Sequence, residues 1–209
     1  MTATTTNRFD RRKARTRAAL IEAAQGLLAG GQTHVSVQHV TELADVALGT
    51  FYNHFDSKDE LFEAAVDDAL EQLGAFLDGA GETLDDPAEV FARSFRLVGR
   101  LHRTTPRLSR VLMSQWTRIA TSDLGLVPRA RRDLELARAA GRFTYDDIEL
   151  ALVLVVGTTL ALARLVHDEP ERDAAADTDR ATTDLLVALG LGRDDARDVA
   201  SRPLPSSPL

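Results

Sequence analysis

The chain has 209 residues, no cysteine and a net charge of −7. This length suffices for a small domain joined to a larger one, and the lack of cysteine excludes disulfide frameworks, thiolate zinc sites and cysteine nucleophiles. No apolar run follows the charged N-terminus, and the longest uncharged stretch, 150–163, is too short to cross a bilayer. We therefore expect a soluble, cytoplasmic protein with no membrane partner.

The basic residues near the N-terminus contrast with an acidic body. Residues 1–17 contain six basic residues and one acid, and residues 1–58 contain seven basic and five acidic residues, a net charge of +2. The acidic excess therefore lies after Lys58. Such a distribution keeps a protein soluble and repels nucleic acid everywhere except at the local basic edge.

Apolar residues recur every three to four positions along almost the whole chain, and no convincing alternating strand pattern occurs. The sequence therefore predicts an all-α fold. The predicted helices, in chain order, cover about 11–29, 37–44, 48–54, 58–77, 88–103, 105–120, 128–141, 144–167 and 178–189, with a short one after Gly192. Residues 79–87 and 168–177 are predicted loops.

Several helix starts carry capping signals. Ser36 suits the cap of the second helix, and Ser57 with Glu60 three residues later forms a capping-box pattern before the fourth. Thr144 is predicted to open the long apolar helix, with Asp147 in its first turn.

Two short helices behind a longer one form the layout of a helix-turn-helix, whose second short helix can enter the major groove of DNA. We expect three parts in the chain. They are an arm and helix-turn-helix DNA-binding domain at 1–60, a helical ligand-binding and dimerisation domain at 61–200, and a disordered tail at 201–209, rich in proline and serine.

The stretch 49–61, Gly-Thr-Phe-Tyr-x-His-Phe-x-Ser-Lys-x-Glu-Leu, resembles the signature of the TetR family, and the match extends over about 11–66. The resemblance implies a transcriptional regulator, most simply a ligand-released repressor that binds a palindromic operator as a homodimer. It also implies that Tyr52, His54 and Lys58 contact backbone phosphates.

The residue types suggest further DNA contacts. Gly49 would let the recognition helix approach the groove closely, and the Thr50 hydroxyl suits a phosphate oxygen. Base edges would be read by Gln38, Leu48, Gly49 and Asn53. Arg11 and Arg12 of the basic arm would add phosphate or minor-groove contacts, unless the arm serves only as a flexible solubilising tail.

Two positions depart from the family pattern. Asp45 stands at a turn where many members have glycine, and Ala47 stands where many have a serine cap. Ala47 cannot cap the recognition helix with its side chain, a loss near ~1 kcal/mol.

The C-terminal part offers candidates for a small apolar ligand. A pocket lined by aromatic side chains and methionine, with a few polar anchors, is typical of small-molecule sites. The candidates are Phe91, Phe95, His102, Leu112, Gln115, Trp116, Ile119 and Val153. Each could equally be an ordinary core residue. On the same helix as Phe91, the arginines at 93, 96, 100 and 103 are expected to face outward.

A homodimer is the expected assembly, because two recognition helices about one DNA turn apart read a palindrome. The resemblance implies a four-helix interface, which the apolar helix 148–166 could form with Leu185, Leu186 and Leu189.

Three other functions compete with this interpretation. An enzyme is disfavoured, because the sequence has no paired histidines at metal spacing, no glycine-rich phosphate loop and no nucleophile elbow. For the same reasons we expect no metal site and no cofactor. An architectural DNA-binding protein would need a broadly basic surface. Activation of transcription, or regulation by a protein partner, stays open.

Overall fold

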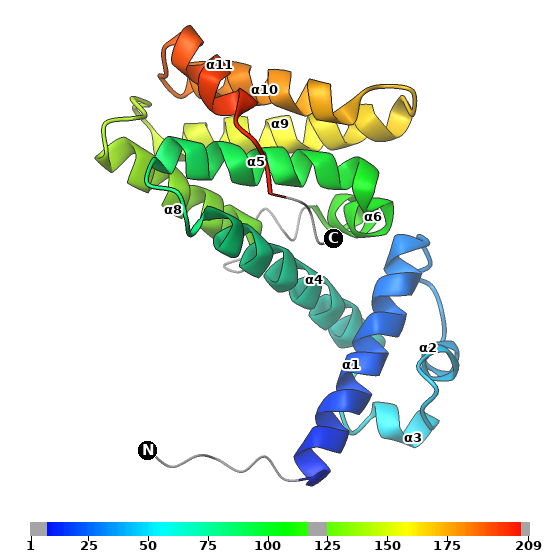
Figure 1. Cartoon of the computed structure of the whole chain (residues 1–209). Helices are drawn as coiled ribbons and strands as arrows, with labels where there is room; N and C mark the ends of the chain where they lie inside the picture. The colour runs from blue at the N-terminus through cyan, green and yellow to red at the C-terminus, as the bar shows by residue number, and fades with distance from the viewer. Residues whose placement is uncertain (1–7, 117–124, 206–209) are drawn as a thin grey trace, which may run out of the picture. The chain divides into compact units, whose positions relative to one another are not determined.

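The computed structural model describes residues 8–116 and 125–205, and all regular structure in these ranges is helical (Figure 1). The all-α prediction is therefore confirmed. The helices are α1 (Arg8–Ala29), α2 (Val37–Leu43), α3 (Leu48–Phe51), α4 (Lys58–Gly81), α5 (Pro87–Thr104), α6 (Pro106–Ser114), α8 (Leu126–Ala139), α9 (Ile148–Asp168), α10 (Ala174–Ala188) and α11 (Arg193–Ser201).

The chain divides into two compact units, 1–69 and 70–209, and α4 belongs to both. The expected boundary at 60/61 falls in the first turn of this helix. Ser201 is the last residue of α11, and the side chain of Arg202, in the segment expected to be a disordered tail, pairs with Glu89 and Asp198.

In the first unit, the short helices α2 and α3 lie beside α1 (Figure 1). Helices α1 to α4 each contribute buried apolar side chains to this unit. The largest of those that are no more than 2% exposed are Leu20, Leu28, Phe51, Phe55 and Leu61. Gln25 of α1 ties this core to α4, because its Nε2 donates to the backbone oxygen of Ala65 at 3.0 Å. Helices α2 and α3 with the residues up to His54 (hereafter the recognition region) therefore lie on an apolar core.

In the second unit, α5 is the central helix and packs against α6, α8, α9, α10 and α11. Phe91 anchors the core, with its ring edge-to-face on Phe143 at 5.5 Å between centroids. Gly99 lets α10 approach, since a side chain there would collide with Thr178. The expectation that Arg96 faces outward is wrong: it is 5% exposed and its Nε donates to Asp179 of α10 at 2.7 Å.

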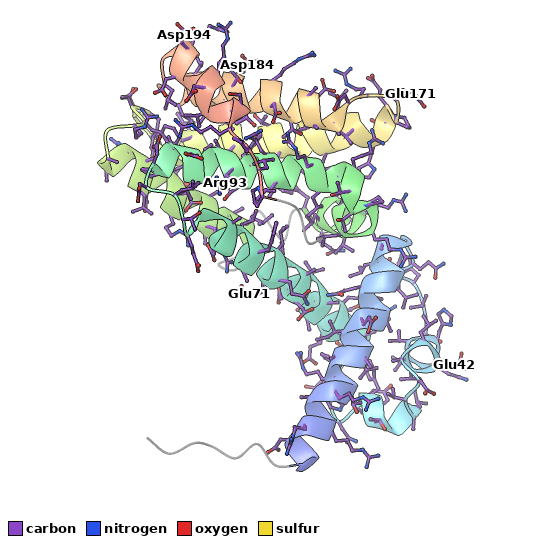
Figure 2. All side chains as sticks on the ribbon, viewed as in Figure 1. Glu42, Glu71, Arg93, Glu171, Asp184 and Asp194 are labelled. Atoms are coloured by element: carbon purple, nitrogen blue, oxygen red, sulfur yellow. The ribbon has the colours of Figure 1, made fainter. Side chains whose placement is uncertain are left out.

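Three predicted helix limits are corrected by tertiary partners or caps. Helix α4 runs through Gly79 to Gly81, into the predicted loop, and Arg93 of α5 donates to the backbone oxygen of Ala80 at 2.9 Å. Figure 2 labels Arg93 on α5. Helix α10 begins at Ala174 because Asp173 caps it. In α9, Asp147 is the cap itself and not a first-turn residue, so Thr144 does not open the helix.

Candidate functional site

The turn between α2 and α3 has the geometry of a helix-turn-helix. Asp45 adopts a left-handed conformation with φ 53°, and the backbone N–H of Val46 then donates to the oxygen of Thr41 at 3.0 Å. A left-handed residue is normally glycine, but aspartate and asparagine tolerate this region better than other side chains. The turn therefore keeps its shape without the glycine.

The caps of the three helices in this region differ. Ser36 caps α2 by accepting from the N–H of His39 at 3.2 Å, and Ser57 accepts from the N–H of Glu60 at 3.1 Å. The Glu60 carboxylate reaches back to the N–H of Asp56, one residue before the position expected for a capping box. Ala47 caps α3 with no side-chain hydrogen bond, as the sequence indicated.

Helix α3 buries one face and exposes the other. Phe51 is fully buried, whereas Leu48 is 48% exposed and Tyr52 58% exposed. A side chain at Gly49 would meet nothing within 4 Å, so the protein itself does not require glycine there. Leu48, Gly49, Tyr52 and Asn53 thus form an open surface (hereafter the α3 face) with a backbone that a partner can approach closely.

Cations lie around this face. Arg17 of α1 stacks over the Phe55 ring at 4.9 Å, and Arg11 and Arg12 are exposed further along α1. The pKa of His54 is lowered, first by burial and then by the nearby charges of Lys13 and Arg17. The basic residues of α1 are therefore close to the C-terminal end of the recognition region.

Lys58 is held more firmly than a surface lysine. Its Nζ donates to the backbone oxygens of Thr33 at 2.9 Å and Val35 at 3.0 Å, and lies 5.9 Å from the centre of the Phe62 ring. An ammonium group has three donors, so one remains for a phosphate. The lysine thus joins the loop before α2 to the start of α4 while keeping a positive charge at the surface.

The second unit contains an apolar cavity of about 80 Å³. Its described apolar walls come from α4, α5, α8 and α9, with Trp116 beyond the end of α6. They are Leu77, Phe91, Phe95, Val98, Trp116, Leu126, Val127, Ala130, Val155 and Val156. A smaller hollow of about 20 Å³ shares Val98, Trp116, Leu126 and Thr159 with it, and is also lined by His102 and Leu112.

A cluster of charged groups borders the larger cavity. Arg129 of α8 bonds to Asp78 at 2.9 Å and to Glu71 at 2.9 Å, both on α4, and Arg132 bonds to Asp78 at 2.8 Å. Figure 2 labels Glu71 on α4. Burial alone would raise the pKa of Asp78, but the hydrogen bonds from Arg129 and Arg132 outweigh it and lower the pKa.

Asp133 is the buried acid of this cluster. It is 5% exposed, and its Oδ1 accepts from Arg132 at 2.9 Å. Burial raises its pKa, and the hydrogen bond from Arg132 compensates only in part. The cavity therefore combines apolar walls with one carboxylate that is poorly solvated.

Comparison with known proteins decides the family. Residues 20–65 match the profile described as "Bacterial regulatory proteins, tetR family", and residues 86–202, more than half of the chain, match "Tetracyclin repressor-like, C-terminal domain". The chain belongs to the TetR family.

Relatives of this TetR-family protein support a repressor. The HTH-type transcriptional repressor KstR of Mycolicibacterium smegmatis is 30% identical over 173 residues, which cover 79% of this chain and 81% of that protein. The crystal structure of RolR in complex with resorcinol is 34% identical, has a TM-score of 0.66, and covers 94% of this chain and 98% of that one. The protein is thus a helix-turn-helix transcriptional repressor of a non-enzymatic family.

The structure brings together the residues predicted to contact DNA. Leu48, Gly49, Tyr52 and Asn53 share the α3 face, and Thr50 and His54 are partly buried beside it. Gln38 is exposed on α2, where its Nε2 donates to Glu42 at 3.0 Å, so it must exchange this bond to read a base. Figure 2 labels Glu42 on α2, at the surface of the first unit.

The predicted ligand residues are placed less uniformly. Phe91, Phe95 and Trp116 line the larger cavity, and His102, Leu112 and Trp116 line the smaller. Val153 is 65% exposed, because the side of α9 that meets the cavity carries Val155, Val156 and Thr159 instead. Gln115 is the C-cap of α6 and is not among the residues that line either cavity. Ile119 lies outside the described residues.

Sequence reasoning missed the charged cluster. Asp78, Arg129, Arg132 and Asp133 come from two helices some fifty residues apart, and charged residues on predicted helices read as solvated faces. Only Asp133 could have been noticed in the sequence, because it is a charged residue among the positions of α8 that face the core of the second unit.

Proposed function

We propose that the protein acts in the cytoplasm as a homodimer that binds a palindromic operator and is released from it by a small apolar, aromatic ligand. The observation that carries the proposal is the linkage within α4. The first turn of this helix carries Lys58, which bonds to the loop before α2, and its C-terminal half is bonded by Asp78 and Glu71 to Arg129, on the wall of the cavity.

DNA contact is assigned to the α3 face and its cations. Tyr52, His54 and the free donor of Lys58 suit phosphate oxygens, and Leu48, Gly49 and Asn53 suit base edges. Arg11 and Arg12 would extend the phosphate contacts along α1. Selection from a random duplex pool should return an inverted repeat whose half-sites lie about one helical turn apart.

A paired substitution tests this assignment. Lys58→Glu combined with Tyr52→Phe should abolish binding to the selected operator in a band-shift titration while the helical circular-dichroism signal is retained. Arg164→Glu, which reverses an exposed cation of α9 in the second unit, should not abolish it. Intact binding by the first variant in folded form would contradict the proposal.

Dimerisation is assigned to α9. By length and composition alone this helix could cross a membrane. One side, however, is buried in the core of the second unit through Leu152, Val155 and Leu162. The other carries Leu150 and Val153, 64% and 65% exposed, with Leu154 and Gly157 beside them (hereafter the α9 stripe). A second copy of the same stripe related by a two-fold axis would cover it.

The predicted contribution of α10 to this interface needs correction. Leu185, Leu186 and Leu189 are 4% exposed or less and belong to the chain's own core. Any contribution of α10 to a dimer must therefore come from its other face.

The ligand is assigned to the apolar cavity. Its volume of about 80 Å³ is smaller than the roughly 150 Å³ of a cavity known to admit benzene, so an aromatic ligand must move the walls apart. A ligand that binds only the expanded form shifts the population toward it. Because Arg129 and Arg132 connect α8 to α4, expansion would move α4 and with it the recognition region.

The relative RolR, crystallised with resorcinol, makes this phenol the natural first probe. In a band-shift titration, saturating resorcinol should weaken operator binding at least tenfold. If tryptophan fluorescence shows that resorcinol binds while operator affinity stays unchanged, release by ligand fails as a mechanism.

A further inference from the structure

A hydrogen-bonded chain of three side chains crosses the second unit beside the cavities. Nδ1 of His102 on α5 lies 2.8 Å from the hydroxyl of Ser109 on α6, which lies 2.7 Å from Nε2 of His167 on α9. Ser109 is fully buried and His102 is 4% exposed. Three helices are thus joined by one serine hydroxyl.

The other ring nitrogen of His102 makes no hydrogen bond to the described residues. Its Nε2 is buried and has no hydrogen-bond partner among residues 8–116 and 125–205. His102 also lines the smaller hollow, which shares the Trp116 wall with the larger cavity. A buried polar atom without a partner is uncommon in proteins, so this nitrogen is available to a group outside the described residues.

The hydrogen bonds that join His102, Ser109 and His167 can run in either of two directions. Burial, followed by the charge of nearby His167, lowers the pKa of His102 to about 4, so near neutral pH the ring is uncharged and one nitrogen donates while the other accepts. If Ser109 donates to His102, the orphan Nε2 carries a hydrogen and becomes an unpaired buried donor. If Ser109 donates to His167, the orphan is an unpaired acceptor.

The second direction is the less costly one without ligand, because unpaired buried N–H groups are rarer in proteins than under-satisfied acceptors. The charges around His167 also favour this second direction, in which Ser109 donates to His167. Burial lowers the pKa of His167, and the charges of Arg110 on α6 and Arg103 on α5 lower it further, against the effect of Asp168. A neutral His167 can accept from Ser109 through Nε2.

We propose that His102, in the smaller hollow that adjoins the cavity, is the ligand-selecting residue: its unprotonated Nε2 accepts a hydrogen bond from a hydroxyl of an aromatic ligand, and Ser109 and His167 hold the ring in that form. The ligand class is therefore a phenol or another hydroxyl-bearing apolar molecule, and an analogue that can only accept hydrogen bonds is rejected. This inference rests on the ligand release proposed above, because the hollow that His102 lines shares Val98, Trp116, Leu126 and Thr159 with the cavity assigned to the ligand.

The tautomer can be tested without any ligand. In the full-length protein labelled with ¹⁵N-histidine, long-range ¹H–¹⁵N spectra at pH 7.5 should show His102 protonated at Nδ1 and bare at Nε2. Ser109→Ala should remove this preference, and Ser114→Ala on the same helix should not. A ring protonated at Nε2 in the free wild-type protein would overturn the proposal.

Selectivity is tested with two matched probes. Trp116 is the only tryptophan, and it stands in the wall of both cavities, so its fluorescence reports occupancy. The wild type should bind resorcinol at least tenfold more tightly than 1,3-dimethoxybenzene, which has the same ring without a donor. His102→Asn keeps a polar atom near the Nδ1 position and removes Nε2, so this ratio should fall to about one.

The outcomes separate the two proposals. An unchanged ratio in a folded His102→Asn protein, or no binding of either probe to the wild type, overturns the role of His102. Neither result bears on DNA binding. If the repressor function is correct, the same protein preparation must still bind the operator in a band shift.

Discussion

Gly49 is expected to matter for DNA binding and not for folding. Because a side chain there meets nothing within 4 Å, Gly49→Ala should leave the fold intact and even raise the free energy of unfolding by up to about 1 kcal/mol, since alanine favours helix. The added methyl group would, however, hold the backbone away from the groove. We expect operator affinity to fall at least tenfold.

Gly26 provides the matched control. It lies in α1 with equally open space around it, so Gly26→Ala should give a similar stabilisation. Urea unfolding and a band-shift titration of both variants check the prediction. If Gly49→Ala and Gly26→Ala bind the operator equally well, close approach at Gly49 is not part of recognition.

His102 should make stability depend on pH. Its folded pKa of about 4 lies below the ordinary 6.5, so the unfolded chain binds the proton first as the pH falls. Its contribution to stability is complete above pH 6.5, declines from there to about pH 4, and amounts to roughly 3 kcal/mol. Urea unfolding at pH 7.5 and 4.5 should show a smaller loss for His102→Asn than for the wild type. Equal losses would mean that the ring does not stay neutral.

The recognition element should gain stability from the cap that it lacks. Helix α3 has four residues and Ala47 gives it no side-chain bond, so Ala47→Ser should add about 0.5–1 kcal/mol. Operator affinity should be retained, because the added hydroxyl would accept from the N–H groups of α3 itself. Removing the existing cap of α2 by Ser36→Ala should cost a similar amount in urea unfolding. A loss at Ser36 without a gain at Ala47 would contradict the capping argument.

The helices could be predicted from spacing and caps, but their limits depended on tertiary partners. Periodicity located every described helix, and Ser36 and Ser57 marked two starts correctly. The run of α4 through Gly79 could not be predicted, because Arg93, thirteen residues beyond its partner Ala80, binds a carbonyl near its end. A helix end is decided partly by what caps its free carbonyls, and that partner is visible only in the fold.

The candidate site shows the same division. The α3 face could be predicted because the whole motif lies within one short stretch. The cavity could not, because a helical period identifies a buried face without distinguishing a core contact from a cavity wall. Val153 illustrates this: it has the apolar character of a wall residue, and yet it is 65% exposed on the α9 stripe.

For the molecule as a whole, the cluster around Arg129 should couple ligand to operator. Gly74 of α4 leaves the space that the Arg129 guanidinium occupies between Asp78 and Glu71. Arg129→Ala removes these bonds and leaves, among the described residues, only the bond from Arg132 to Asp78 between the two charged faces, so cavity expansion should be transmitted to α4 much less. The tenfold weakening of operator binding by saturating resorcinol should drop below about threefold, because coupling energies of this kind are ~1–3 kcal/mol.

Arg131→Ala is the control for this coupling. Arg131 is also on α8, but it pairs with Glu149 of α9, so the response to resorcinol should persist. Band shifts with and without resorcinol, together with Trp116 fluorescence to confirm occupancy, make the comparison. A full response in a ligand-bound Arg129→Ala protein would show that α4 is moved by other contacts.

The α9 stripe makes the assembly testable by a single charge. Val153→Glu would place two carboxylates, one from each copy, in an apolar interface around the two-fold axis, and an unpaired buried charge costs several kcal/mol. We expect the dimer to dissociate at micromolar concentration in analytical ultracentrifugation. Operator binding should fall in parallel, because one recognition helix alone contacts only a half-site.

Leu136 of α8 is 54% exposed outside the stripe, so Leu136→Glu should remain dimeric and bind normally. A dimeric Val153→Glu protein would place the interface elsewhere on the second unit.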